Sequence, residues 1–148
     1  MKTTFDKPTR DALIVRINLL NENSTAQWGK MTVYQMVRHC IAWEEMLTSN
    51  TRYKRSFAGF LFGKIALRTL TKDEKPLGRS TPTSPELMIK ETDGDVAAEK
   101  KKWIVLLEAH ENFSTNEFMH PFFGKMTKEQ VGYLAYKHID HHLRQFNS

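Results

Sequence analysis

Residues 127–146 read TKEQVGYLAYKHIDHHLRQF, and this stretch predicts the last helix of the chain. Thr127 followed three residues later by Gln130 has the form of a capping box, which begins an α-helix. At 3.6 residues per turn, the stretch has one inward stripe, and two histidines belong to it. This stripe consists of Val131, Leu134, Ala135, His138, His142 and Phe146. The opposite face carries Lys137, Asp140 and Arg144, so the pattern predicts an amphipathic helix with its histidines inside.

The pair of histidines on this stripe favours a metal site. His138 and His142 are four residues apart, so their side chains lie one above the other and can reach a single ion. A buried imidazole must satisfy two ring nitrogens, and metal ligation satisfies one of them. Either histidine alone is more simply an ordinary core residue, but the two together favour a metal ligand pair.

A second capping box, from Thr32 to Gln35, predicts a helix that continues to about Ser49. His39 lies at the edge of the apolar stripe of this helix. We therefore predict one metal site, formed by His39, His138 and His142, with no fourth protein ligand. Three neutral imidazoles suit zinc, nickel or ferrous iron and leave positions open for water or substrate.

The remaining candidate residues have weaker signals. His141 lies to one side of the pair, and we expect it beside the ligands, on a dimer surface or in solvent. Trp43 is most simply a core residue, with a place beside the site as the alternative. His110 is expected in the last turn of a helix and His120 in a loop, while Cys40 is expected to be a buried, inert thiol. No catalytic residue can be assigned from these patterns.

The chain predicts an all-α fold in a single domain, residues 1–148. No useful length of alternating strand pattern occurs, and the fold expected is an up-down four-helix bundle. A long crossover between the second and third long helices should contain a short helix near residues 57–70, followed by a proline-punctuated loop. The long helices are expected at about 8–21, 32–49, 96–112 and from 127 nearly to the end.

Composition restricts the class of protein. The 148 residues are 40% hydrophobic and 26% charged, as in soluble globular proteins. The longest apolar run, Phe57 to Phe62, is too short to span a bilayer, so we expect no membrane partner. The first residues lack the apolar region of a secretory signal, and Cys40 is the single cysteine. We therefore expect a cytoplasmic protein without disulfides.

The positive charge is concentrated in one segment. Residues 52–79 hold eight basic and two acidic residues, a net of +6 in a chain whose total is +5. The simplest interpretation is a solvated face, and the sharper one is a surface that attracts an anionic small molecule. In the second case Lys64 and Arg68, which are four residues apart, would hold a carboxylate near the site. No nucleic-acid-binding motif accompanies the charge, so no nucleic acid partner is expected.

The C-terminal motifs also carry a resemblance. Residues 120–127, HPFFGKMT, and 136–146, YKHIDHHLRQF, resemble the HPxFG and HxDHHLRQF signature of an uncharacterised subfamily of the DinB/YfiT-like superfamily. Residues 28–40 and 80–85 fit the same subfamily, so the likeness covers most of the chain. Val131 departs from the pattern, because similar sequences often have tryptophan there, but the three histidine positions match.

The resemblance implies a four-helix bundle in which His39, His138 and His142 bind a divalent metal, and it implies a homodimer. Characterised relatives include S-transferases that use low-molecular-weight thiols and a thiol-dependent isomerase. The leading hypothesis is therefore a metal-dependent thiol S-transferase acting on a small electrophilic substrate, with an anionic substrate as one expectation. The alternatives are a metal-dependent hydrolase that uses metal-bound water and a non-catalytic metal- or ligand-binding module. Spacing alone predicts only the metal site, and the thiol chemistry comes from the resemblance.

Overall fold

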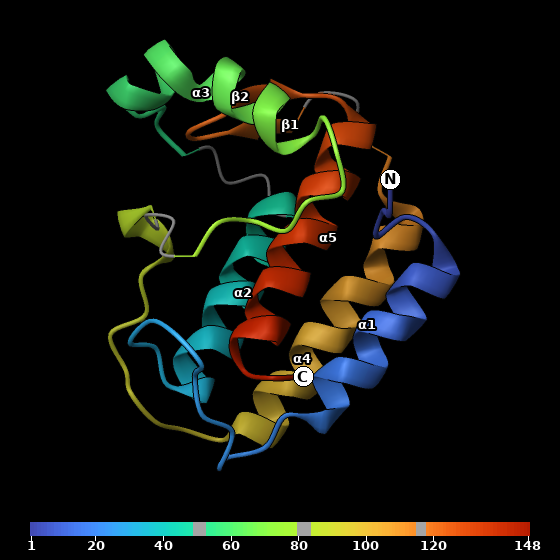
Figure 1. Ribbon diagram of the computed structural model, residues 1–148, viewed down its shortest axis with the longest axis vertical. Coiled ribbons are helices and arrows are strands. Elements are labelled where there is room, and N and C mark those ends of the chain that lie inside the picture. Colours follow the sequence, from blue (N-terminus) through green and yellow to red (C-terminus); the bar gives the residue numbers. More distant parts are fainter. Residues whose placement is uncertain (49–52, 80–83, 115–117) are drawn as a thin grey trace.

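The computed structural model describes residues 1–48, 53–79, 84–114 and 118–148. Within these residues the protein is mostly helical, as the sequence predicts, and four long helices lie side by side (Figure 1). The four are α1 (Lys7–Leu19), α2 (Val33–Thr48), α4 (Val96–Glu108) and α5 (Lys128–Gln145). Helices α1 and α5 run in one direction and α2 and α4 in the other. The crossover between α2 and α4 therefore returns the chain along the length of the bundle.

The crossover contains the short helix that the sequence predicts, here α3 (Phe57–Leu70), and then a turn of 3-10 helix, η1 (Pro85–Leu87). The helix predicted at 96–112 is α-helical only to Glu108 and ends in the 3-10 helix η2 (Ala109–Asn112). The helix predicted at 8–21 ends at Leu19. The predicted end of the second helix, Ser49, lies outside the described residues.

A small β-hairpin corrects the prediction of an all-α chain. Strands β1 (Phe118–His120) and β2 (Gly124–Met126) pair in antiparallel register, with Phe118 opposite Met126. His120, expected in a loop, is the last residue of β1. Its Nδ1 accepts the backbone N–H groups of Phe122 and Phe123, at 3.0 and 3.2 Å. Strands of three residues are too short to show an alternating pattern, which is why the sequence did not reveal them.

Helix starts follow the local sequence closely. Both predicted capping boxes are present: the hydroxyls of Thr32 and Thr127 accept the backbone N–H groups of Gln35 and Gln130. The two glutamine side chains accept the N–H groups of the threonines in return. These contacts satisfy backbone donors that lack partners in a first helical turn, and they fix where α2 and α5 begin.

The core has two parts. One lies between the long helices and includes the fully buried side chains of Ile17, Met36, Trp103 and Leu143. The other lies between the end of α2, the start of α5, the hairpin and α3. It is formed by Trp43, Met46, Leu47, Leu67, Leu87, Phe113, Phe118, Met126, Val131, Leu134 and Ala135. Trp43 belongs to this core, and it also contacts the ring of His138, so both of its expected places describe it.

Helix α5 is buried on two faces, which the single predicted stripe did not anticipate. Ile139 and Leu143 have no exposed surface and occupy the core face, whereas His138 is only partly buried. Lys137, predicted on the outer face, is 6% exposed. Its ammonium group donates to the carbonyl of Leu70 and lies 3.9 Å from the carboxylate of Asp73. The crossover thus covers a flank of α5 that an amphipathic pattern alone would leave in solvent.

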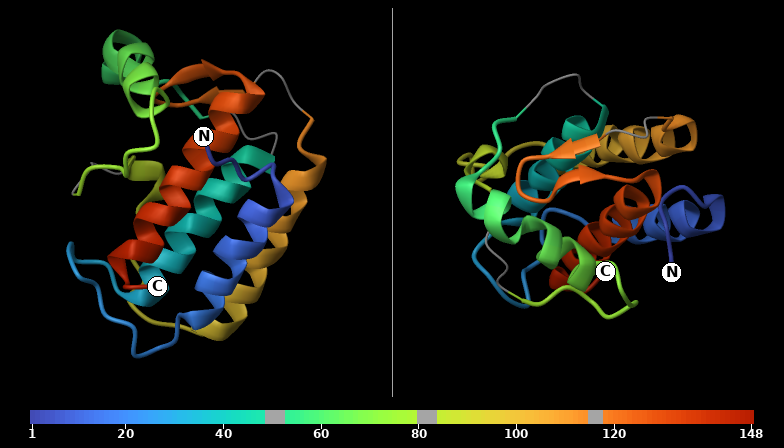
Figure 2. Two further views of the ribbon diagram at one scale, coloured as in Figure 1. Left: turned by 45° about the vertical axis from the view of Figure 1, so that its right-hand side comes forward. Right: turned by 90° about the horizontal axis from the view of Figure 1, so that it is seen from above.

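The crossover lies along this flank, while α3 lies beside the hairpin at one end of the molecule (Figure 2). The last residue of α3, Leu70, contacts α5 at Lys137, and the last residue of η1, Leu87, contacts α2 at His39. None of the helices in the described part of the chain is long and apolar enough to cross a membrane.

Candidate metal centre

Three histidines from two helices meet where α2 passes α5. His39 comes from α2, and His138 and His142 come from α5. One ring nitrogen from each lies within 4.8 Å of the other two. The ring centroids are 5.0, 4.9 and 4.7 Å apart, so the imidazoles form a nearly equilateral triangle. The structure brings together the three residues that the sequence singled out as metal ligands.

The outer nitrogen of His39 is held by the crossover. Nδ1 lies 3.0 Å from the backbone carbonyl oxygen of Leu87. A carbonyl only accepts hydrogen bonds, so Nδ1 carries the hydrogen and Nε2 presents a lone pair toward the other two rings. A hydrogen bond to a metal-binding histidine through its outer nitrogen is the usual means of orienting such a ligand.

His142 is held in the same tautomer from within its own helix. Its Nδ1 lies 2.9 Å from Oε1 of Gln145, three residues further along α5. The amide of Gln145 is itself oriented, because its Nε2 donates to the carbonyl of Trp28 at 2.8 Å. The oxygen must therefore face the imidazole, so Nδ1 of His142 is a donor and Nε2 carries a lone pair.

His138 completes the triangle through stacking and a hydrogen bond to its neighbour. Its ring lies on the indole of Trp43, at 5.2 Å between centroids and 25° between planes. Its Nε2 is 2.9 Å from Nε2 of His39, which has no hydrogen, so His138 donates in this contact. The buried Nδ1 of His138 has no hydrogen-bond partner within the described residues.

Burial keeps all three imidazoles neutral at pH 7. It lowers the pKa of His39 and of His138, the latter well below the usual value. For His142, burial and then the neighbouring His39 lower the pKa to about 3. A neutral imidazole is the form that binds a metal, so these nitrogens are available without loss of a proton from an imidazolium ion.

The donor set fits a divalent transition metal. It offers three neutral nitrogens, and the cluster found among the described residues has no carboxylate or thiol ligand. Imidazole suits zinc, iron and nickel, and three protein ligands leave room for a further, exchangeable ligand. Cys40 is fully buried and burial raises the pKa of its thiol well above the usual value, so it fits the predicted inert role.

Three more side chains extend the cluster by successive contacts that start at His142. The ring centroids of His141 and His142 are 5.1 Å apart, and those of Trp28 and His141 are 5.6 Å apart in an edge-on arrangement. The guanidinium of Arg79 lies over the Trp28 ring at 4.4 Å. Burial lowers the pKa of His141, opposed by its hydrogen bond to the backbone of Leu77. His141 thus lies beside the three clustered histidines, the first of its three expected positions.

The contact of Lys64 lies away from this cluster, and among the described residues no contact joins Arg68 to it. Lys64 donates to the carbonyl of Lys125 in the hairpin, and Arg68 is exposed on α3. His138 follows Thr127 by 11 residues of α5, a rise of roughly 16 Å, so the hairpin end of the helix is remote from the imidazoles. Arg79, also in segment 52–79, lies over Trp28, which contacts His141.

Sequence reasoning missed Gln145, Trp28 and Arg79. Gln145 was within reach of the sequence, because its spacing of three from His142 places it on the same helical face. Trp28 and Arg79 carry no local signal, since they come to the site from a loop and from the crossover.

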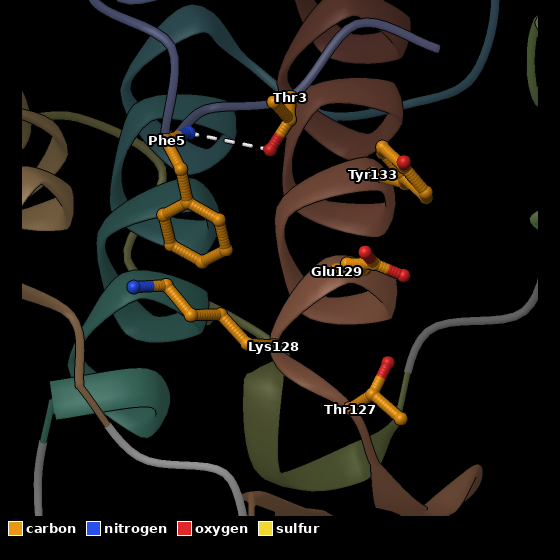
Figure 3. Close-up of a pocket in the computed structure, with 6 residues that line it drawn as sticks. All are labelled: Thr3, Phe5, Thr127, Lys128, Glu129 and Tyr133. Atoms are coloured by element: carbon orange, nitrogen blue, oxygen red, sulfur yellow. Dashed lines mark hydrogen bonds between the residues drawn. The ribbon is translucent and has the colours of Figure 1, made fainter.

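The surface pocket in Figure 3 is a different feature. It has a volume of about 570 Å³ and lies between the N-terminal segment and the first turns of α5 (Figure 3). Its lining residues are Thr3, Phe5, Thr127, Lys128, Glu129 and Tyr133. None of these residues contacts the histidine cluster in the interactions described above, and the pocket has no group of metal-binding side chains.

Comparison with known proteins gives one match. The model of a family described as "Protein of unknown function (DUF1569)" matches residues 2–148. No curated protein and no solved structure matches the chain.

Proposed function

This chain belongs to the DUF1569 family along residues 2–148, and we propose that it is a divalent-metal-binding protein that acts as a metal-dependent enzyme. The reaction proposed is thiol S-transfer to a small electrophilic substrate, with a low-molecular-weight thiol as the second reactant. We also propose that the four long helices form a DinB-like four-helix bundle, that the protein is a cytoplasmic homodimer, and that nucleic acid is not a partner.

One observation carries the metal proposal: three imidazoles converge, with one ring nitrogen of each within 4.8 Å of the other two. Two of them, His39 and His142, have their outer nitrogens fixed by Leu87 and Gln145. The third, His138, has a buried Nδ1 for which the described part of the chain offers no hydrogen-bond partner. Burial, and then the neighbouring imidazoles, lower the pKa of His138 and of His142, so both rings are in the neutral form that a metal ion binds.

The residues around the cluster have distinct roles in this proposal. A bound zinc, nickel or iron ion would supply Lewis acidity, which lowers the pKa of a thiol or a water molecule that it holds. Trp43 restricts the ring of His138 by stacking. His141, anchored to Leu77 through one ring nitrogen, holds or accepts a proton at the other. Arg79, exposed over Trp28, attracts the anionic group of the thiol or substrate, the role first expected of Lys64 and Arg68.

The metal proposal is tested on protein purified without an affinity tag. We expect about one divalent ion per chain by elemental analysis, and the loss of that ion in His39→Ala, His138→Ala and His142→Ala. His141→Ala is the matched control and should retain the metal, because this imidazole lies beside the cluster and not in it. Circular dichroism establishes that each variant is folded.

Failure to bind added zinc, nickel or iron in the folded wild-type protein would contradict the metal site. With a metal site established, turnover of electrophiles with a panel of thiols tests the S-transferase. Loss of that turnover in His142→Ala supports it. Hydrolysis without any thiol would favour the hydrolase, and metal binding without turnover would favour a binding module.

A further inference from the structure

Helix α3 carries an unusual amount of exposed apolar surface. Five of its 14 residues are large hydrophobic side chains that are more than half exposed. They are Phe57 at 80%, Phe60 at 70%, Leu61 at 51%, Phe62 at 59% and Ile65 at 66%. A contiguous patch of this kind marks an interaction site in a soluble protein.

The patch has a helical arrangement. Gly59, Gly63 and Leu67, spaced four residues apart, are buried and form the stripe of α3 that faces the protein. A second set with the same spacing starts two residues earlier and consists of Phe57, Leu61 and Ile65. Residues two apart point to nearly opposite sides of a helix, so this set lies on the side of α3 away from the protein. Helix α3 therefore has two apolar stripes, and the second points away from the molecule.

The contact with the hairpin fixes this orientation. A Cβ atom on Gly59 would lie 2.4 Å from the carbonyl oxygen of Phe122, and one on Gly63 only 2.1 Å. Only glycine allows so close an approach of the helix to the hairpin backbone. Because α3 lies against the hairpin through its glycines, at the edge of the molecule (Figure 2), rotation that would bury the outer stripe would lose this contact.

Positive charge borders the outer stripe. Helix α3 contains no acidic residue, and Lys54, Arg68 and Lys72 are exposed and make no ion pair with another described residue. The two acidic residues of the basic segment have partners elsewhere: Asp73 lies 3.9 Å from Lys137, and Glu74 lies 3.3 Å from the N-terminal amine. The surface offered by α3 is thus both apolar and cationic.

We propose that α3 docks the protein on an anionic phospholipid surface. Phenylalanine, leucine and isoleucine flanked by lysine and arginine on a helix are the combination that inserts between lipid headgroups while the cations contact acidic lipids. Fourteen residues span roughly 21 Å, less than the hydrocarbon core of about 30 Å, so the helix lies in the interface. A second copy of the chain fits less well, because pairing the two patches would bring like charges together.

This proposal is independent of the metal site. It differs from the sequence-based expectation of no membrane partner, which rested on the length of the apolar run and therefore concerned membrane spans. The exposure of that same run, Phe57 to Phe62, becomes visible only when α3 is placed against the hairpin.

The test is co-sedimentation of the wild-type protein with lipid vesicles. We expect binding to an equal mixture of phosphatidylcholine and anionic phosphatidylglycerol, and little binding to phosphatidylcholine alone. High salt should weaken binding. Phe57→Ser with Ile65→Ser should lower the bound fraction about tenfold or more by removing apolar contacts with the lipid. Arg68→Gln with Lys72→Gln should lower it about tenfold at low salt.

Matched controls exist on other faces. Val15 and Leu19 on α1 are 62% and 65% exposed, so Val15→Ser with Leu19→Ser removes comparable apolar surface without touching α3. Lys90→Gln with Lys101→Gln removes two exposed charges elsewhere. Both control variants should bind the mixed vesicles as the wild type does.

Absence of vesicle binding by the wild-type protein would overturn the proposal, as would equal losses in the α3 and control variants. Analytical ultracentrifugation identifies the main competitor. A wild-type dimer that Phe57→Ser with Ile65→Ser converts to monomers, without any vesicle binding, would assign the patch to a second copy of the chain.

Discussion

At the scale of single residues, Gln145 has the most direct influence on the histidine cluster. It accepts from His142 and donates to Trp28, so it fixes both the ring orientation and the tautomer of His142. We predict that Gln145→Leu weakens metal binding 10- to 100-fold, the usual cost of losing such a supporting contact. Competition with a chromophoric chelator measures this affinity.

Gln145→Glu is the matched variant, because a carboxylate keeps an acceptor for Nδ1 of His142 while losing the donor to Trp28. It should retain most of the affinity. Equal losses in the two variants would show that packing, and not the hydrogen bond to the imidazole, is the contribution of this residue.

The sequence predicted the residues of the cluster but not its surroundings. The i, i+4 spacing of His138 and His142 and the position of His39 at a stripe edge follow from helical geometry, which depends on local sequence. Trp28, Arg79 and Leu87 approach from other segments, and such contacts depend on where the crossover lies. No local pattern encodes that path.

At the scale of elements, the hairpin depends on a neutral histidine. Nδ1 of His120 accepts two backbone N–H groups, and burial lowers the pKa of His120 to about 4. The unfolded chain, with a pKa of about 6.5, binds more protons between these values, so the free energy of unfolding falls as the pH decreases. We expect His120 to contribute a loss of up to about 3 kcal/mol from pH 6.5 to 4.

His120→Asn isolates this contribution, because an asparagine oxygen can accept similar hydrogen bonds without titrating. Urea unfolding of the metal-free wild type and variant at several pH values gives the difference. The wild type should lose more stability than the variant below pH 6.5. Parallel pH dependences would mean that His120 does not titrate in this range.

Elements with strong local signals were predicted well. Helices α2 and α5 begin at the two capping boxes, and α3 has the predicted bounds. The hairpin was missed because its strands are three residues long and its turn is closed by His120, whose sequence context indicated only a loop. Short elements depend on tertiary contacts for their stability, so their local sequence carries little information.

At the scale of the whole molecule, a buried polar network attaches the N-terminal segment to the bundle. Nδ1 of His110 lies 2.8 Å from the hydroxyl of Thr4, and Nε2 lies 2.6 Å from the carboxylate of Glu44. All three residues are at most 1% exposed. The backbone N–H of Thr4 also donates to the carbonyl of Gly132 in α5. The first residues thereby connect η2, α2 and α5.

We predict that Thr4→Val lowers the free energy of unfolding by about 1–3 kcal/mol, because it leaves a buried nitrogen of His110 without a partner. Thermal or urea unfolding measures the change. Thr25→Val, at an exposed position, is the control and should change stability by less than about 0.5 kcal/mol. A Thr4→Val protein as stable as the wild type would indicate that another group or a water molecule replaces the hydroxyl.

The crossover has a consequence for how the site opens. It is bonded to α5 at Lys137 through Leu70 and to His39 through Leu87, and Leu77 is bonded to His141. Local unfolding of this segment would break the hydrogen bonds that hold the rings of His39 and His141. A ligand that binds the imidazoles only while the crossover is closed opposes that local unfolding by RT ln(1 + [L]/Kd), where [L] is the free ligand concentration and Kd its dissociation constant. Ligand binding at the site and closure of the crossover are thus thermodynamically linked, so each one favours the other.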